Sequence, residues 1–132
     1  MVVLDTSAVI AAANRLDNAH EAVGEAISHW RGSRILPVPI LSEIGYMLEV
    51  VGGHKDVSNF LRSLARGEFA LDCCQEDALE AHRLVERYAD MRLGLADSYV
   101  TTCAKRNGGR LVTADRRHFE PLAREFGLML AP

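Results

Sequence analysis

The sequence is poor in aromatic residues and in cysteine, and it contains no long apolar run. Aromatic side chains make up 6% of the 132 residues, which excludes a stacking platform for single-stranded bases. The three cysteines, Cys73, Cys74 and Cys103, form no C-x-x-C pair, and an odd count with two adjacent thiols is a poor disulfide framework. We therefore expect them to be reduced core residues of a cytoplasmic protein.

Long hydrophobic segments and an excess of positive charge are also missing. No uninterrupted apolar run approaches the roughly 18 residues that a membrane-spanning helix needs. The N-terminus lacks a basic leader before an apolar segment, so we expect neither secretion nor membrane insertion. The net charge of −3, from 15 basic and 18 acidic residues, produces no global field that attracts nucleic acid. Any polyanion would need a local basic patch.

Composition and length favour one globular domain over residues 1 to 132, because 48% apolar and 25% charged residues are ordinary proportions. Short apolar runs alternate with longer segments of helical period, which is typical of crossover units around a parallel sheet. The expected strands are residues 2 to 4, 35 to 38, 69 to 71, 111 to 112 and 128 to 130. We predict an α/β fold with a doubly wound parallel sheet and helices on both faces.

Helical segments fill the intervals between the expected strands. They are residues 7 to 13, 18 to 31, 40 to 51, 56 to 66, 75 to 88, 96 to 107 and 117 to 125. Gly52-Gly53 ends one of them, since glycine readily adopts left-handed backbone. We predict that the helical pair over residues 40 to 66 projects from the body, because its connection at Gly52, Gly53 and His54 is tight and polar.

Acidic residues follow two of the expected strands. In MVVLDTSAVI the apolar run Val2 to Leu4 ends at Asp5, and in LVTADRRHF Asp115 follows the fourth strand with two residues between. Ligands of open parallel sheets collect outside the carboxyl ends of the strands. If the first and fourth strands are neighbours, Asp5 and Asp115 face each other at this edge.

Two further acids reach the same edge from helices. Glu43, in PILSEIGYML, lies near the start of the helix after the second strand, and Asp97, in GLADSYVTTCA, near the start of the helix before the fourth. Asp97 shares a helical row with the apolar Val100 and Ala104, and Glu43 shares one with Met47. A charge on or beside an apolar face is costly unless it is paired or bound to a metal.

Four clustered carboxylates need a cation. Helix N-termini stabilise a nearby anion by only ~0.3 to 1 kcal/mol, which is too little to hold four together. Oxygen ligands without histidine or cysteine favour Mg²⁺ or Mn²⁺ over zinc. Such a site takes part of its coordination from a substrate phosphate and activates water for attack on phosphorus. The predicted chemistry is metal-dependent phosphodiester hydrolysis.

Each acid taken alone also has a structural explanation. Asp5 and Asp97 suit helix N-caps, and Glu43 suits a first helical turn with a surface partner. Asp115 suits a turn. Two other functions stay open as alternatives: a catalytically silent scaffold that binds RNA or a protein, and an aspartate-nucleophile phosphatase. The phosphatase would need a second acid two residues after Asp5, where Ser7 stands.

Four stretches, in this order, resemble the PIN-domain ribonucleases and specifically the VapC toxins of type II toxin-antitoxin systems. They are LDTSAVIA, SEIGYML, LGLADSYVTTCAKRNGG and LVTADRRHF, and together they span nearly the whole chain. The resemblance implies a single PIN-like domain with five parallel strands in the order 3-2-1-4-5. It also implies an endoribonuclease that cleaves RNA, often a tRNA or rRNA, and so stops translation.

The resemblance assigns roles to residues of this chain. The acids around Mg²⁺, for which Mn²⁺ substitutes, are Asp5, Glu43, Asp97 and Asp115. The polar side chains that orient these acids or their waters are Thr6, Ser7 and Thr113. Many relatives carry another acid just before Asp97, whereas residues 94 to 96 are uncharged here. We therefore expect one tightly held metal ion.

Partners are also implied by the resemblance. They are a cognate antitoxin whose C-terminal segment covers the acidic pocket, and a second copy of the chain in a homodimer, within a toxin-antitoxin hetero-oligomer. Operator DNA would be bound only through the antitoxin. We expect an apolar groove near residues 40 to 64, including Met47 and Leu64, to take the antitoxin.

Basic residues beside the acidic edge are candidates for RNA contact. Arg116 and Arg117 follow Asp115 directly, and arginine is well shaped for phosphate. Weaker candidates are Lys105, Arg106 and Arg110. His118 is expected to be a helix-start or packing residue, because a metal-bound water removes the need for a general acid.

Overall fold

The computed structural model describes all 132 residues and contains a five-stranded parallel sheet in the order β3-β2-β1-β4-β5. The strands are β1 (Val2–Leu4), β2 (Arg34–Pro37), β3 (Ala70–Asp72), β4 (Arg110–Val112) and β5 (Met129–Ala131). This order confirms the one that the resemblance implied. It places β1 at the centre, so the residue that follows β1 lies in the middle of the sheet edge.

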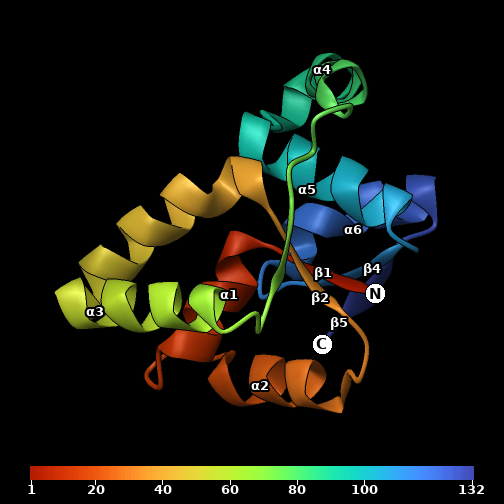
Figure 1. Cartoon of the computed structure of the whole chain (residues 1–132). Coiled ribbons are helices and arrows are strands. Elements are labelled where there is room, and N and C mark those ends of the chain that lie inside the picture. The colour runs from red at the N-terminus through yellow and green to blue at the C-terminus, as the bar shows by residue number, and fades with distance from the viewer.

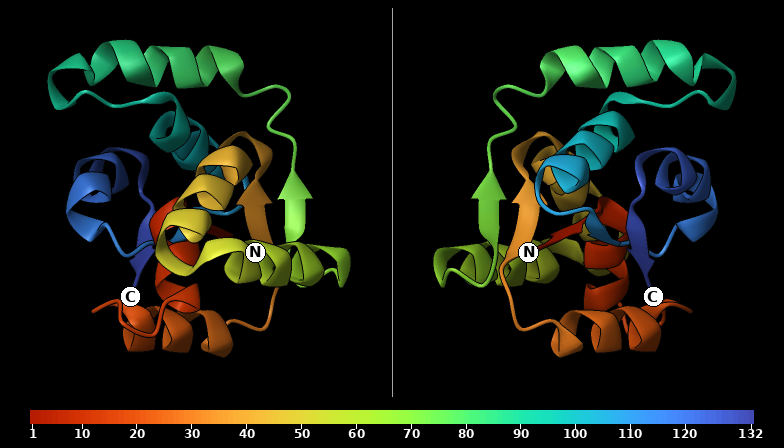
Figure 2. Two further views of the ribbon diagram at one scale, coloured as in Figure 1. Left: turned by 90° about the vertical axis from the view of Figure 1, so that its left-hand side faces the viewer. Right: turned by 90° about the vertical axis from the view of Figure 1, so that its right-hand side faces the viewer.

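Six helices cover the two faces of the sheet (Figure 1). They are α1 (Thr6–Ala13), α2 (His20–His29), α3 (Leu41–Ala65), α4 (Ala78–Arg87), α5 (Leu95–Arg106) and α6 (Arg116–Phe126). Helix α1 packs against α2 and α3, whereas α5 crosses the other face, where it contacts β1, β2 and β4. Helix α4 lies outside α5, and α6 packs on β5 (Figure 2). No helix combines the length and apolar character needed to cross a membrane.

The core is built on the central strand and the helices that face it. Val2, Val3 and Leu4 are all buried, as a central parallel strand covered on both faces requires. Phe119 of α6 and Leu48 of α3 belong with them to a single cluster of 24 buried residues. This packing makes the carboxyl edge of β1 and β4 a rigid support for whatever follows them.

Helix α3 is bent at one glycine. Gly53 has φ 73° and ψ −164°, a region that is essentially restricted to glycine. The two halves of α3 form a V whose apex points away from the sheet (Figure 1), so the predicted break and projection are both present. Only Ile44 and Leu48 of this helix are buried, which leaves much of its apolar surface exposed.

The sequence placed most element ends within two residues of the observed ones. The largest shift is at α4, which begins at Ala78 instead of residue 75, because residues 73 to 77 form a turn. In that turn the Cys74 amide donates to Asp72 Oδ1 and the Asp77 amide donates to the Cys74 carbonyl. A local side-chain acceptor therefore competes with helix formation there.

Candidate active site

Asp5 ends the central strand and is almost completely buried, with 5% of its surface exposed. Its carboxylate caps α1, because Oδ1 accepts the amide of Ala8 at 2.9 Å. Ser7 Oγ donates to the same carboxylate at 2.8 Å, and Thr113 Oγ1 donates to Oδ2 at 2.8 Å. Asp5 is therefore both the N-cap of α1 and a member of the predicted site, because the hydrogen bonds that begin α1 also fix the orientation of its carboxylate.

The four predicted acids line one pocket of about 340 Å³ at this edge of the sheet. They come from four different elements or junctions: Asp5 after β1, Glu43 in the first turn of α3, Asp97 in the first turn of α5, and Asp115 at the N-cap of α6. A fifth acid, Asp17 in the loop between α1 and α2, lines the same pocket. No lysine or arginine lines it.

Burial and mutual repulsion shape the acidity of these groups. Burial raises the pKa of Asp5 to about 6 from an ordinary 3.8, although the hydrogen bonds from Ala8, Thr113 and Ser7 act against it. Burial also raises the pKa of Asp97, and the charges of Glu43 and Asp115 add to the rise. The raised pKa values show that the charged forms of these carboxylates lack enough positive charge nearby to offset burial and repulsion.

His118 makes the one contact between the acids and a basic side chain. Its Nε2 lies 2.8 Å from Asp97 Oδ2, and its presence lowers the pKa of Asp97 against the effect of burial. The approach is off the N–H direction of the ring, so this is a short polar contact without hydrogen-bond geometry. The prediction that His118 starts a helix is correct, but the residue also reaches the acidic pocket.

The three predicted supporting residues do not all reach the acids. Ser7 and Thr113 both donate hydrogen bonds to the Asp5 carboxylate, and their hydroxyl oxygens lie 3.2 Å apart. Thr113 Oγ1 also accepts the amide of Asp115 at 2.9 Å, which links two acids through one hydroxyl. Thr6 lines the pocket but makes no side-chain hydrogen bond.

Of the basic residues predicted to contact RNA, one arginine is unpaired and the others already have partners within the protein. Arg117 is exposed and forms no ion pair or side-chain hydrogen bond. Arg116 instead donates to the carbonyl of Pro132 at 2.8 Å and pairs with Glu120, so it faces the C-terminus. The weaker candidates have structural partners: Lys105 pairs with Glu80, Arg106 with Asp72 and Asp77, and Arg110 stacks on Trp30.

The donor set of the pocket fits a hard divalent cation. All its titratable lining groups are carboxylates, and oxygen ligands suit Mg²⁺ or Mn²⁺. Asp5 is buried there with a raised pKa, which a bound cation would reverse. The residues that would hold the ion are Asp5, Glu43, Asp97 and Asp115.

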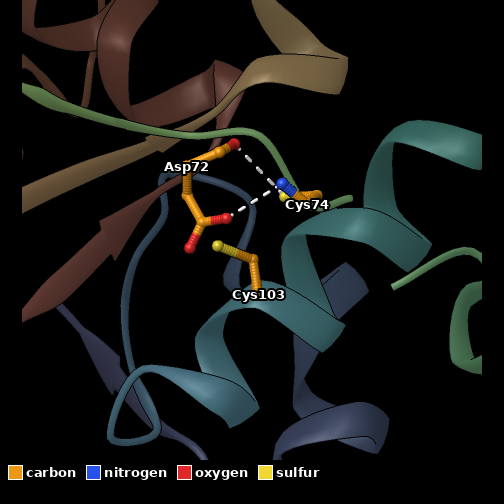
Figure 3. A group of neighbouring side chains, drawn as sticks. All are labelled: Asp72, Cys74 and Cys103. Atoms are coloured by element: carbon orange, nitrogen blue, oxygen red, sulfur yellow. Dashed lines mark hydrogen bonds between the residues drawn. The ribbon is translucent and has the colours of Figure 1, made fainter. Parts of the chain in front are cut away.

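A second group of metal-type donors lies at the end of β3, where ligand atoms of Asp72, Cys74 and Cys103 lie within 4.8 Å of one another (Figure 3). It does not fit a metal. The Asp72 carboxylate already accepts four N–H groups, two of them from Arg106. The adjacent Cys103 thiol and burial raise the pKa of Cys74, which disfavours the thiolate that a metal requires.

These buried thiols bear on the cysteine prediction. Cys74 and Cys103 are buried and free, as expected of reduced core residues. Cys73 is exposed, so its assignment to the core is wrong. Both residues lie in the turn after β3, where the Cys74 thiol faces inward and donates to the Asp72 carbonyl at 3.4 Å, while the Cys73 side chain faces solvent.

The fold and the acidic edge together define a class of protein: the chain belongs to the PIN domain family, whose model matches residues 2–125. Among sequenced relatives it is 32% identical over 123 residues to ribonuclease VapC26 of Mycobacterium tuberculosis (strain ATCC 25618 / H37Rv). That alignment covers 92% of this chain and 91% of the relative. The family that the sequence resembles is therefore confirmed.

Solved structures show the same fold at low sequence identity. The crystal structure of VapC20 from Mycobacterium tuberculosis, described as a sarcin-ricin loop cleaving toxin, matches with a TM-score of 0.80 at 13% identity. The match covers 89% of this chain and 92% of that one. FitAcB from Neisseria gonorrhoeae matches with a TM-score of 0.67 at 15% identity, over 100% of this chain and 97% of the other.

Sequence reasoning missed Asp17, an acid that lines the pocket, and the contact of His118 with one of the lining acids. Asp17 lies in a short loop, and the only local signal is that its carboxylate accepts the amide of Ala19 before α2. His118 was assigned a helix-start or packing role because a metal-bound water removes the need for a general acid. Its contact with Asp97 spans 21 positions and depends on how α5 and α6 meet, so no local pattern reveals it.

Proposed function

We propose that this protein is a metal-dependent endoribonuclease of the VapC type, with Asp5, Glu43, Asp97 and Asp115 as the residues that hold Mg²⁺ or Mn²⁺. The single observation that supports this most is the convergence of these acids from four elements on one pocket without a lysine or arginine. A relative named as a ribonuclease points to the same activity. A structural role for the four acids would instead need counter-charges inside the protein.

The protein groups around Asp5 are arranged to keep its carboxylate in place. Ser7, Thr113 and the Ala8 amide hold it from the protein side while it lines the pocket. A divalent cation bound there would supply an activated water for in-line attack on the RNA phosphate. Thr113 also fixes the backbone at Asp115, so the acids from β1 and α6 keep a constant separation.

The proposed substrate is structured RNA such as a tRNA or rRNA, which is recognised by shape and by phosphate contacts. The chain has a net charge of −3, so its RNA contacts must be local. Arg117 is the unpaired cation next to the acidic edge, and it is the proposed phosphate contact. Arg116 is a weaker candidate because it is bound to the C-terminus.

The experiment that tests the activity is cleavage of total cellular RNA by the purified protein with Mg²⁺ or Mn²⁺. Matched reactions contain EDTA or the Asp5→Asn variant, which keeps the shape of the side chain without its charge. Discrete fragments that require both the metal and Asp5 support the proposal, and mapping their ends identifies the target. Absence of cleavage together with absence of Mn²⁺ binding would favour the silent scaffold.

The second part of the proposal is an antitoxin partner that binds the exposed apolar surface of α3. Tyr46, Val50 and Leu61 are 67%, 64% and 58% exposed, and a hollow of about 270 Å³ between α1, α2 and α3 adjoins this helix. Met47 connects the surface to the acidic pocket, which it also lines. A partner segment on α3 can therefore extend to the active site.

Co-purification tests this surface. Leu61→Asp should weaken retention of the co-expressed antitoxin, whereas Leu79→Asp on α4, which is 61% exposed, serves as the matched control. Leu64 is unsuitable for this test, because it packs against the core and its change to Asp would also lower the stability of the fold. Equal retention by both variants would contradict the α3 surface. Gel filtration of the free protein tests the proposed homodimer.

A further inference from the structure

The acids of the pocket differ in how the protein holds them. The Asp5 carboxylate accepts bonds from Ser7, Ala8 and Thr113. The Asp97 carboxylate accepts no hydrogen bond within the protein, and its one close polar neighbour is His118 Nε2 at 2.8 Å. Asp97 is therefore the acid whose orientation depends on a single side chain.

His118 connects two acids of the pocket at once. Its backbone amide donates to Asp115 Oδ1 at 3.3 Å as part of the α6 cap, while its ring reaches Asp97 at the start of α5. The ring is held edge-on against Phe119, with centroids 5.9 Å apart and planes at 77°. Phe119 is 1% exposed, so the imidazole is supported by the core.

Resting on the proposed function, we propose that His118 is a positioning residue that holds Asp97 in its metal-binding orientation. The imidazole lies against Oδ2, so the other carboxylate oxygen has no protein partner. Groups of this kind behind metal ligands commonly change metal affinity by 10- to 100-fold. A charged ring and a neutral imidazole with hydrogen on Nε2 both place a polar N–H group beside Asp97 Oδ2.

Side-chain variants isolate this contact, because every one of them keeps the backbone bond to Asp115. His118→Ala removes the imidazole and its contact with Asp97. His118→Gln places an amide N–H near the position of Nε2 and is the conservative variant. His82→Ala, on the exposed side of α4, is the matched histidine control.

The first measurement is Mn²⁺ binding to each protein by calorimetry and by the Mn²⁺-dependent rise in melting temperature, without RNA. His118→Ala should bind Mn²⁺ about 10- to 100-fold more weakly, His118→Gln should recover at least part of that loss, and His82→Ala should match the wild type. In cleavage assays the Mn²⁺ concentration for half-maximal rate should rise by the same factor. A purely structural role would lower the melting temperature without shifting this concentration.

Each outcome decides the inference separately from the proposed function. Equal Mn²⁺ affinity of His118→Ala and the wild type would overturn the role of His118 and leave the nuclease intact. Tighter binding by His118→Ala would also overturn it, because the ring would then compete with the ion for Asp97. A wild type that binds no Mn²⁺ would overturn both proposals.

Discussion

Two strands of the same sheet lead into an aspartate at the carboxyl edge, and the two carboxylates have opposite surroundings. Asp72, the last residue of β3, bonds to Arg106 with both oxygens, and this holds its pKa well below the usual range. Asp5, directly after β1, has no basic partner, and burial raises its pKa to about 6. The first carboxylate belongs to a closed structural network and the second to an open pocket.

The difference lies in where the counter-charge comes from. Arg106 at the end of α5 also binds the buried Asp77 at 2.7 and 2.9 Å, so one guanidinium neutralises two acids inside the protein. Asp5, by contrast, shares its pocket with further carboxylates and no arginine or lysine. An acidic cluster whose counter-charge is missing from the fold is the one suited to bind a cation from solution.

Removing one carboxylate from each cluster should break the comparison most clearly. Asp5→Asn should reduce metal-dependent RNA cleavage by at least about 100-fold, because loss of a ligand exceeds loss of the groups behind it. Asp72→Asn should leave cleavage near the wild-type rate at a temperature where it is folded. Initial rates on one RNA at saturating Mn²⁺ measure both, with circular dichroism as the folding control. Equal losses would show that both clusters serve the reaction.

Removal of Arg106 should lower the stability of the protein. Arg106→Ala leaves Asp72 and the 3% exposed Asp77 without their partner. Breaking a fully buried ion pair costs about 3 to 5 kcal/mol, but the Arg106 side chain is 41% exposed. We therefore expect the free energy of unfolding to fall by about 2 to 3 kcal/mol. Urea unfolding measures this, with the solvent-exposed Arg117→Ala as control. Unchanged stability would mean that the network does not hold α5 against the β3–α4 turn.

The pH dependence of stability should separate the two aspartates. A carboxyl whose pKa is raised on folding makes the folded state bind more protons, so stability of the metal-free protein falls as pH rises from about 4 towards 7. For Asp5, with 3.8 rising to about 6, this amounts to roughly 1 to 3 kcal/mol. Asp97 adds in the same direction. Asp72 has a lowered pKa, so its carboxylate stabilises the folded state above pH 3.8, and this contribution is lost only as the pH falls below that value.

Urea unfolding in EDTA at pH 4.5 and 7.5 tests these signs. The stability of Asp5→Asn relative to the wild type should increase between the two values, since the variant avoids a buried charge at pH 7.5. The relative stability of Asp72→Asn should stay nearly constant over the same interval. A constant difference for Asp5→Asn would show that its carboxylate is already solvated or paired in the metal-free protein.

The sequence predicted the elements better than it predicted their contacts. Apolar runs and helical periods located all five strands, because each is a local pattern. The four acids were predicted to lie together because strand ends and helix starts collect at one edge of such a sheet, and they line one pocket. Strand order came only from the resemblance, since strands of three or four residues carry no pairing signal of their own.

What separates Asp72 from Asp5 is not local. Arg106 lies 34 positions from Asp72 and 29 from Asp77, and only the packing of α4 against α5 brings them together. For this reason Arg106 could be interpreted from the sequence as an RNA contact, although the fold uses it internally. The same holds for Asp97 and His118, which meet only when α5 and α6 are placed.

The smallest expected effect concerns the basic residues, where one arginine is unpaired and its neighbour is bound within the protein. Arg117→Ala should weaken RNA binding about 2- to 5-fold and reduce the salt dependence of the affinity by about one unit of slope, as the loss of one phosphate contact requires. Arg116→Ala is the matched control, because Arg116 already bonds to Pro132 and Glu120. Gel-shift titrations in the Asp5→Asn background measure binding without cleavage. If Arg116→Ala has the larger effect, the RNA approaches along the C-terminal side of α6, and the ion pair with Glu120 opens when it binds.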